Sequence, residues 1–238
     1  MNGLTPNCID DFIFSNPAER AVLEMILSRK LPFPLGGKSG ILLHGTWGTG
    51  KTTFAQLLPD LIEVAYSGTW NMQLGVGQMP APAVSHAQTE VFRCGGGLSS
   101  TVIKQTVEKF NAVMPLHHQS GHDYFVIDEI DRLTLGAQLS LRSIMNLKRC
   151  MFFCTTNNLS AVDQGVINRC HLIEMNQATN LNAYLPLANS ILAGMGVGSN
   201  VVPATTLTGY AKSARGSMRD FIHEVAIEGV KHGGILKQ

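Results

Sequence analysis

The chain has 238 residues, of which 45% are hydrophobic and 15% are charged, and its formal net charge is +1. This length supports one well-buried core with a small additional domain, and this composition excludes an intrinsically disordered chain. The balanced charge excludes nucleic-acid binding through bulk electrostatics alone, so any contact with DNA needs a local basic patch.

Cysteine usage and the lengths of the apolar runs bear on the location of the protein. The five cysteines form no CxxC pair, and the sequence shows no signal peptide. Both features favour a reducing compartment. No apolar stretch approaches the roughly 20 residues that span a bilayer. We therefore expect a cytoplasmic protein that has no membrane partner.

The first third of the chain alternates between helical and strand patterns. Ser15-Asn16-Pro17 is typical of a helix start, and apolar residues at helical spacing predict a helix over residues 18–29. Ile41–His44 predicts a short buried strand that leads into a glycine-rich loop, and helical spacing resumes at Lys51. The stretch 67–90 has no clear periodicity, so we expect an excursion or hairpin on the surface.

The middle of the chain continues the alternation, and the end does not. Further strands are predicted at 91–94, 124–127, 151–154 and 171–175, with helices over 99–113 and 137–148. This order predicts an α/β fold with a doubly wound, mainly parallel, five-stranded sheet over residues 1–176. Residues 177–238 carry only helical patterns, and we expect them to form a small helical lid domain. Its helices are predicted over 181–193, 203–214 and 218–231.

The glycine-rich loop GTWGTGKT matches the phosphate-binding pattern G-x-x-x-x-G-K-[ST]. Glycines let consecutive backbone N–H groups converge on phosphate oxygens, and the N-terminus of the following helix favours an anion. We expect Lys51 to reach the β- and γ-phosphates and the Thr52 hydroxyl to bind Mg²⁺. The sequence therefore predicts ATP and Mg²⁺ as cofactors. The predicted nucleotide-binding residues of the loop are Gly45, Thr46, Trp47, Gly48, Thr49, Gly50, Lys51, Thr52 and Thr53.

An acidic pair, Asp128-Glu129, follows the apolar run Tyr124–Ile127. Both carboxylates are expected at the carboxyl edge of a central strand, where ligands bind in open α/β sheets. Asp128 would hold Mg²⁺ through water, and Glu129 would polarise the attacking water as a general base. A solvated acidic turn is the alternative, but the position of the pair after a phosphate-binding loop favours the catalytic interpretation.

Several further stretches resemble AAA+ ATPases, and more narrowly the clamp-loader clade. The order of these stretches is similar to that in a small subunit of the replication-factor-C type without its collar domain. Ile167–Cys170 falls where that family carries Ser-Arg-Cys, and Gly216–Arg219 resembles its sensor 2 motif, GDMR. The other similar stretches are residues 93–110, Gln138–Met145 and Met151–Asn157.

The resemblance implies an AAA+ core with a helical lid, and it implies roles for individual residues. Asn157 would contact the γ-phosphate or the attacking water. Arg169 would be an arginine finger that acts on ATP bound to a neighbouring subunit, and Arg219 would contact the γ-phosphate of its own ATP. The segment with Ile9 and Phe14 would lie against adenine. An ordinary surface salt bridge is the alternative for either arginine.

The resemblance also implies an ATPase that assembles with itself or with related subunits and acts in DNA replication. Its partner would be a sliding clamp or a helicase on primed or single-stranded DNA. The sequence ends at Gln238, too soon after Arg219 for a clamp-loader collar, so we expect assembly through the ATPase domain. A helicase loader or transposition regulator is one alternative, and a nucleotide-binding structural subunit without turnover is another. A local basic face for DNA phosphates is an open alternative to ordinary solvated lysines. Its residues would be Lys104, Lys109, Lys148 and Arg149.

Overall fold

A five-stranded sheet forms the centre of the computed structural model, which describes residues 6–67, 87–94, 100–112, 118–198 and 200–235. The strand order is β2-β3-β4-β1-β5, and every pairing is parallel. This confirms the α/β fold class predicted from the sequence. The strands are β1 (Gly40–His44), β2 (Thr89–Arg93), β3 (Asp123–Asp128), β4 (Cys150–Thr156) and β5 (Cys170–Glu174).

The central strands are apolar because both of their faces are buried. In β1, Ile41 and Leu43 enter one core cluster, whereas Leu42 enters the cluster on the opposite face. The same alternation places Phe153 of β4 in the first cluster and Phe152 in the second. The period of two along each strand therefore divides the apolar residues between two layers of helices.

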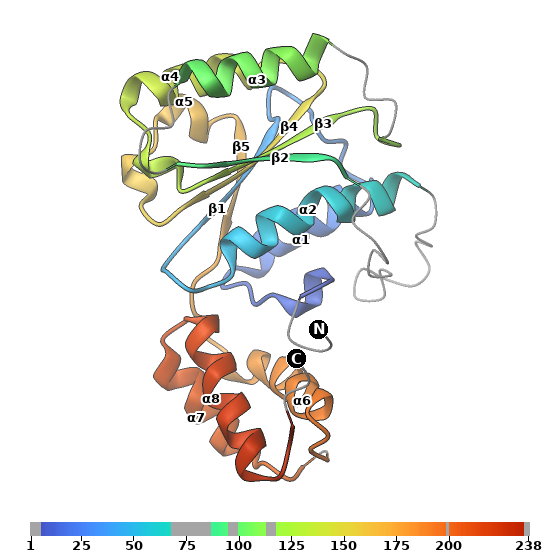
Figure 1. Ribbon diagram of the computed structural model, residues 1–238, viewed down its shortest axis with the longest axis vertical. Coiled ribbons are helices and arrows are strands. Elements are labelled where there is room, and N and C mark those ends of the chain that lie inside the picture. The colour runs from blue at the N-terminus through green and yellow to red at the C-terminus, as the bar shows by residue number, and fades with distance from the viewer. Residues whose placement is uncertain (1–5, 68–86, 95–99, 113–117, 199, 236–238) are drawn as a thin grey trace.

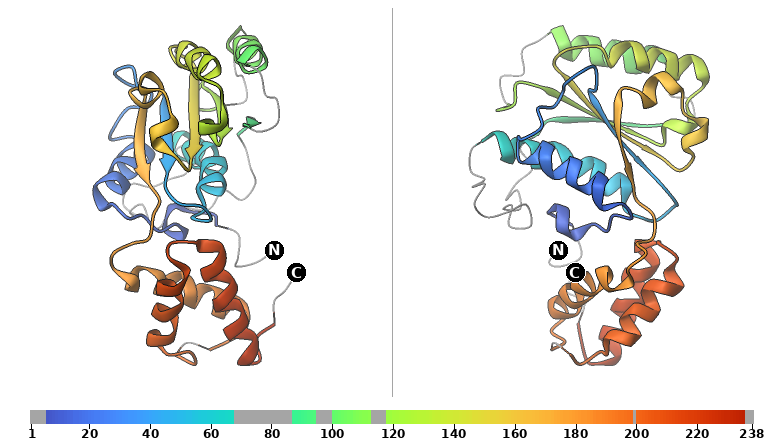
Figure 2. Two further views of the ribbon diagram at one scale, coloured as in Figure 1. Left: turned by 90° about the vertical axis from the view of Figure 1, so that its left-hand side faces the viewer. Right: turned by 180° about the vertical axis from the view of Figure 1, so that it is seen from behind.

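Helices cover both faces of the sheet (Figures 1 and 2). Helices α1 and α2 lie on one face, and α3, α4 and α5 lie on the other. The Asn16 side chain accepts a hydrogen bond from the Ala18 amide at 3.0 Å, so α1 starts at the predicted signal. The short α5 gave no sequence signal because four residues carry no periodicity. The bounds are α1 (Pro17–Leu27), α2 (Lys51–Tyr66), α3 (Ser100–Ala112), α4 (Leu135–Ile144) and α5 (Gln164–Ile167).

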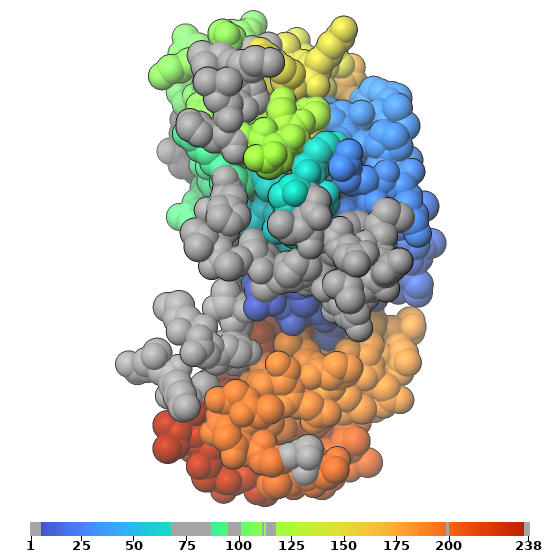
Figure 3. All heavy atoms as spheres, turned by 90° about the vertical axis from the view of Figure 1, so that its right-hand side faces the viewer, coloured from blue at the N-terminus to red at the C-terminus, as the bar shows by residue number. Residues whose placement is uncertain are grey.

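Three helices after the sheet pack around a separate core, in which the rings of Tyr184 and Phe221 meet edge-on with centroids 5.1 Å apart. The dark blue N-terminal segment lies between the sheet and this helical domain (Figure 3), and Ile13 packs against the helical core. None of the helices in the described residues has the length and apolar character of a membrane span. The three helices are α6 (Leu185–Gly194), α7 (Ala204–Ala214) and α8 (Met218–Lys231).

Several predicted boundaries differ from the structure by a few residues; the helix predicted over 137–148, for example, is α4 at Leu135–Ile144. The predicted excursion over 67–90 extends too far, because β2 begins at Thr89; residues 68–86 lie outside the described residues. A half-polar edge strand such as TEVFR lacks the apolar run that identified the central strands. The predicted helix at 181 begins as a 3-10 turn, Leu181–Tyr184, before α6 starts.

A buried carboxylate joins α2 to the amino end of the sheet. Glu63 is 5% exposed and accepts hydrogen bonds from the amides of Gln119 (2.6 Å) and Ser120 (3.3 Å) and from the Tyr124 hydroxyl. Replacing Tyr124 by Phe removes one of these donors and leaves the charge buried. We expect a loss of about 1–3 kcal/mol in the free energy of unfolding, measured by urea titration.

The matched control is Tyr66→Phe. Tyr66 is the last residue of α2, the helix that carries Glu63, and its ring lies against the Arg29 guanidinium. That variant is expected to stay within about 0.5 kcal/mol of the native chain. Equal stability of Tyr124→Phe and the native chain would show that Glu63 needs no hydrogen bond from the tyrosine.

Candidate nucleotide-binding site

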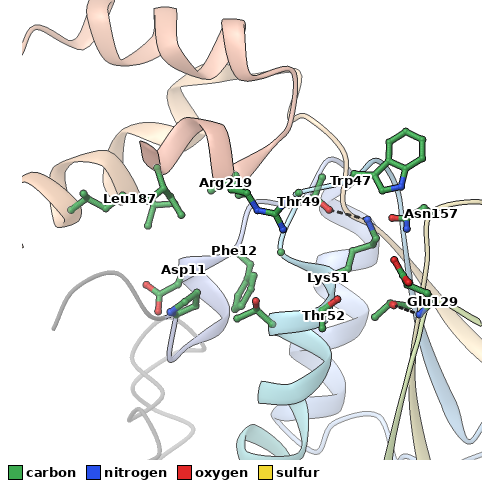
Figure 4. Close-up of a pocket in the computed structure, with 18 of the residues that line it drawn as sticks. Asp11, Phe12, Trp47, Thr49, Lys51, Thr52, Glu129, Asn157, Leu187 and Arg219 are labelled. Carbon is green, nitrogen blue, oxygen red and sulfur yellow. Dashed lines mark hydrogen bonds between the residues drawn. The ribbon is translucent and has the colours of Figure 1, made fainter. Parts of the chain in front are cut away.

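A cavity of about 460 Å³ lies between the carboxyl edge of the sheet and the helical domain (Figure 4). The glycine-rich loop contributes residues 47–53 to its lining, and the sheet contributes Glu129, Thr155 and Asn157. The helical domain contributes an apolar wall and one charged side chain. These residues are Leu187, Ile191, Met218 and Ile222, with Arg219 beside them.

The loop conformation requires glycines at the two positions that the motif reserves for them, 45 and 50, and at the variable position 48. Gly45, Gly48 and Gly50 have φ values of 140°, 77° and 93°, which other residues rarely adopt. A Cβ on Gly45 would also lie 2.7 Å from the Met175 carbonyl oxygen. The amide of Thr46 donates to the Asn176 side chain at 2.9 Å, which fastens the loop to the end of β5.

Lys51 is the first residue of α2, and its ammonium lies inside the loop. It donates to the carbonyl oxygens of Gly45 (3.0 Å) and Thr46, and to the Thr49 hydroxyl at 3.4 Å. Burial lowers the pKa of Lys51 to about 8, although nearby carboxylates, Asp128 foremost, favour its charged form. Gly45 and Thr46 do not line the cavity, but their carbonyl groups hold the lysine beside it.

The two residues predicted to hold the metal are brought together. One Asp128 carboxylate oxygen, Oδ1, accepts hydrogen bonds from the Thr52 hydroxyl at 2.7 Å and from the Thr155 hydroxyl at 2.6 Å. Hydroxyl and carboxylate oxygens are the hard ligands that Mg²⁺ prefers. The side chains present therefore fit a magnesium ion held by Thr52 directly and by Asp128 through water.

Glu129 follows β3 in a left-handed backbone conformation (φ 59°, ψ 53°), which is uncommon for a residue with a side chain. Its amide donates to the Thr155 hydroxyl at 2.9 Å, and its carboxylate pairs with Arg132 at 3.0 Å. The side chain lines the cavity on the same side as Asn157 (Figure 4). The surrounding contacts therefore hold Glu129 where the cavity meets the sheet.

Arg219 extends from the first turn of α8 toward the glycine-rich loop, across the cavity from Asn157 and Glu129 (Figure 4). The amides of Met218 and Arg219 both donate to the Gly48 carbonyl oxygen, at 2.8 and 3.2 Å. The Gly48 carbonyl oxygen thus accepts hydrogen bonds from the first free N–H groups of α8. These two hydrogen bonds connect the helical domain directly to the loop.

Arg169 lies at the opposite edge of the sheet. It directly precedes β5, whereas the cavity lies at the carboxyl ends of the strands. Five strand residues at about 3.3 Å each separate the two edges by roughly 17 Å, beyond the reach of the side chain. Within the described part of the chain, the guanidinium is held by two neutral partners, the Asn146 side chain (3.0 Å) and the Gly165 carbonyl oxygen (2.9 Å).

The segment predicted to lie against adenine reaches the cavity through residues other than Ile9 and Phe14. Ile9 is fully buried in the core, and Phe14 packs edge-on against Phe54 with centroids 5.6 Å apart, so neither lines the cavity. Asp11 and Phe12 line it instead. The 3-10 turn Ile9–Asp11 buries its first residue and leaves the residues at its end beside the cavity. A segment this short gives no periodicity from which its orientation could be predicted.

Sequence reasoning also missed Thr155 and Asn176. Thr155 lies two residues before Asn157, and alternate residues of a strand share a face, so this position carried a usable signal. Asn176 carried none, because its contact with Thr46 joins residues 130 positions apart.

Three comparisons place the chain among known proteins. The model of the ATPase family associated with various cellular activities (AAA) matches residues 41–177. A search of curated protein sequences found no match. The RuvB Holliday junction branch migration motor of Thermotoga maritima is similar in structure, with 17% identity, a TM-score of 0.64, and coverage of 99% of this chain and 70% of that chain.

PCH-2 of C. elegans is also similar, with 15% identity, a TM-score of 0.52, and coverage of 93% of this chain and 70% of that chain. An arginine-to-alanine variant of Thermotoga maritima RuvB gives 16% identity and a TM-score of 0.64, with coverage of 98% of this chain and 69% of that chain. At such low identity, these likenesses show a shared fold.

Proposed function

The chain belongs to the AAA family, the ATPases associated with various cellular activities, and from this premise we propose that it hydrolyses ATP with Mg²⁺ as a self-assembled machine on DNA. The observation that carries the proposal is the convergence of Lys51, Glu129 and Arg219 on one cavity, with Arg169 at the opposite edge of the sheet. Because Arg169 lies away from the cavity of its own chain, it is available to the cavity of a second copy.

The residues of one subunit divide the work as follows. Lys51 exchanges the loop carbonyl groups for the β- and γ-phosphate oxygens, and Arg219 binds the γ-phosphate from the lid. Thr52 and Asp128 would hold Mg²⁺, which would supply charge neutralisation at the phosphate oxygens. Glu129 accepts a proton from the attacking water, and Asn157 orients that water or the γ-phosphate. Phe12 and the apolar wall of the helical domain would hold the adenine ring, with Asp11 as the nearby polar group.

Arg169 completes the site of the neighbouring subunit. A guanidinium is planar, always charged and able to pair with two oxygens at once, which suits the γ-phosphate in the transition state. Hydrolysis will therefore depend on assembly into a ring or spiral. Such a machine works inside the cell, where its nucleotide is supplied.

The DNA role rests on the clamp-loader resemblance and on the likeness to a branch migration motor. We propose primed or single-stranded DNA as the effector, with a sliding clamp or a helicase as the protein that is loaded or remodelled. Lys104 pairs with Glu108 at 3.8 Å, and both side chains are half exposed, so this lysine remains available to a phosphate. A second candidate, a DNA-translocating motor or helicase loader, is favoured by the RuvB likeness and would need no clamp.

The test is ATP turnover across a series of protein concentrations, with and without primed single-stranded DNA. The proposal expects turnover per subunit to rise with concentration and again with DNA. Turnover that is flat in both would contradict a self-assembling machine on DNA. A chain that binds ATP without turnover would instead be a structural subunit, in which Glu129 serves no purpose as a base.

The pKa of Lys51 predicts how ATP binding depends on pH. The free protein loses the Lys51 proton as pH rises through about 8, whereas bound phosphates keep the ammonium charged. Binding therefore takes up a proton above this pH, and the dissociation constant should rise by up to about tenfold per pH unit. Below pH 8, Lys51 contributes no pH dependence.

The measurement is a titration with a fluorescent ATP analogue between about pH 7 and 9.5, with Lys51→Arg as the control. Arginine stays charged throughout this range, so the variant should show a flatter profile even if it binds more weakly. The same slope in both proteins would exclude Lys51 as the titrating group.

A further inference from the structure

Strand β4 ends with two buried threonines whose hydroxyl groups have different partners. Thr155 is 1% exposed, donates to Asp128 Oδ1 at 2.6 Å and accepts the amide proton of Glu129 at 2.9 Å. A hydroxyl has one proton and two lone pairs, so it performs both tasks at once. One side chain thus contacts the predicted metal-holding residue and the predicted general base.

The contact with Glu129 bears on the orientation of the base. The left-handed backbone of this residue is unfavourable for a side-chain-bearing residue, and it persists only where neighbouring groups fix it. The Thr155 hydroxyl accepts a hydrogen bond from the amide of this strained residue. A change of that backbone would redirect the carboxylate, so the threonine controls where the base points.

The contact with Asp128 bears on the metal. Thr52 and Thr155 both donate to Oδ1, and two donors use both lone pairs of that oxygen. The second carboxylate oxygen, Oδ2, is then the one left to receive a metal-bound water. Without Thr155 the carboxylate keeps the Thr52 donor but loses the second one, and its last torsion has a broad and roughly two-fold energy profile.

We propose that Thr155 is a positioning residue of the ATPase reaction, which orients Asp128 toward the metal and Glu129 toward the attacking water. The proposal rests on the proposed function, because both carboxylates act in ATP hydrolysis. Thr155 also lines the cavity, whereas its neighbour Thr156 does not. The Thr156 hydroxyl donates to Asp131 at 2.7 Å and accepts a hydrogen bond from the Asn158 amide, so its partners differ from Asp128 and Glu129.

The test compares Thr155→Val, which keeps the shape and removes the hydroxyl, with Thr155→Ser, which keeps the hydroxyl. Loss of a residue that orients a metal ligand typically lowers activity by about 10- to 100-fold. For the valine variant we expect a fall of that size in kcat, a higher Mg²⁺ concentration at half-maximal activity and little change in the KM for ATP. The serine variant should recover most of the native kcat and Mg²⁺ midpoint.

Thr156→Val is the matched control, because it removes a buried hydroxyl from the next residue of the same strand without touching Asp128. It should lower the free energy of unfolding without moving the Mg²⁺ midpoint. A valine variant at 155 with the native kcat and midpoint would overturn the proposal, as would an equal midpoint shift in Thr156→Val.

Failure of the proposed function would look different. In that case the native chain would show no turnover, and Glu129→Gln would change nothing. The Mg²⁺ dependence of binding a fluorescent ATP analogue would then still test the orientation of Asp128. A native midpoint in the Thr155→Val variant would reject the positioning role in that assay too.

Discussion

Glu129→Gln is expected to bind ATP as tightly as the native chain and to lose turnover by about 10²- to 10⁴-fold, the usual contribution of a general base. The carboxylate lines the cavity and is held there through its amide and its pairing with Arg132. Glutamine keeps the size and the hydrogen-bonding reach of the side chain, but it cannot accept the proton of the attacking water. Binding depends on the loop and Lys51, which the substitution leaves untouched.

The measurement is steady-state phosphate release together with binding of a fluorescent ATP analogue. Glu108→Gln is the matched control, since it makes the same chemical change on the exposed face of α3 and should keep native turnover. A Glu129→Gln variant that hydrolyses ATP at the native rate would remove this residue as the base. Loss of binding together with turnover would point to a structural fault.

Arg169→Ala is expected to keep ATP binding and to lose nearly all of the turnover that appears on assembly, about 10³- to 10⁵-fold for an arginine finger. Its position at the amino edge of the sheet keeps it from its own cavity. Its two hydrogen bonds go to the neutral groups of Asn146 and Gly165, so the alanine variant should remain folded. The loss should therefore be specific to the assembled protein.

Arg142→Ala provides the control for charge, because Arg142 is an exposed arginine near α5 that pairs with Asp163 at 3.8 Å. It removes the same charge near the same edge and should retain most of the assembly-dependent turnover. Arg169→Lys should behave like the alanine variant, since an ammonium cannot reproduce the planar fork of a guanidinium. Equal losses of turnover in Arg142→Ala and Arg169→Ala would contradict a specific finger, because any positive charge at this edge would then have the same effect.

The sequence predicted those parts of the site that depend on local spacing. The loop could be predicted because a strand, two glycines at fixed spacing and a helix start follow one another in order, which leaves the backbone little choice. The carboxylates of Asp128 and Glu129 could be placed because parallel strands end at the same edge of a sheet. The fold class followed from the alternation of apolar runs with helical patterns.

Contacts between distant segments could not be predicted from one sequence. The Asn176 side chain accepts a hydrogen bond from Thr46, 130 positions earlier in the chain. The Met218 amide at the start of α8 donates to the Gly48 carbonyl oxygen. The presence of Phe12 and Asp11 in the cavity lining, where Ile9 and Phe14 were predicted, depends on the direction of one short turn, which carries no periodic signal. The family is established by the match over residues 41–177, while the clamp-loader role stays a prediction.

The central claim is that the site of one subunit is completed by Arg169 of another, and mixing two inactive variants tests it most directly. Arg169→Ala subunits keep Glu129, and Glu129→Gln subunits keep the finger, so a mixed assembly contains complete sites. We predict that ATP turnover in the mixture rises well above the sum of the two variants measured alone. A mixture that never exceeds that sum, at concentrations where the native chain is fully active, would contradict the account.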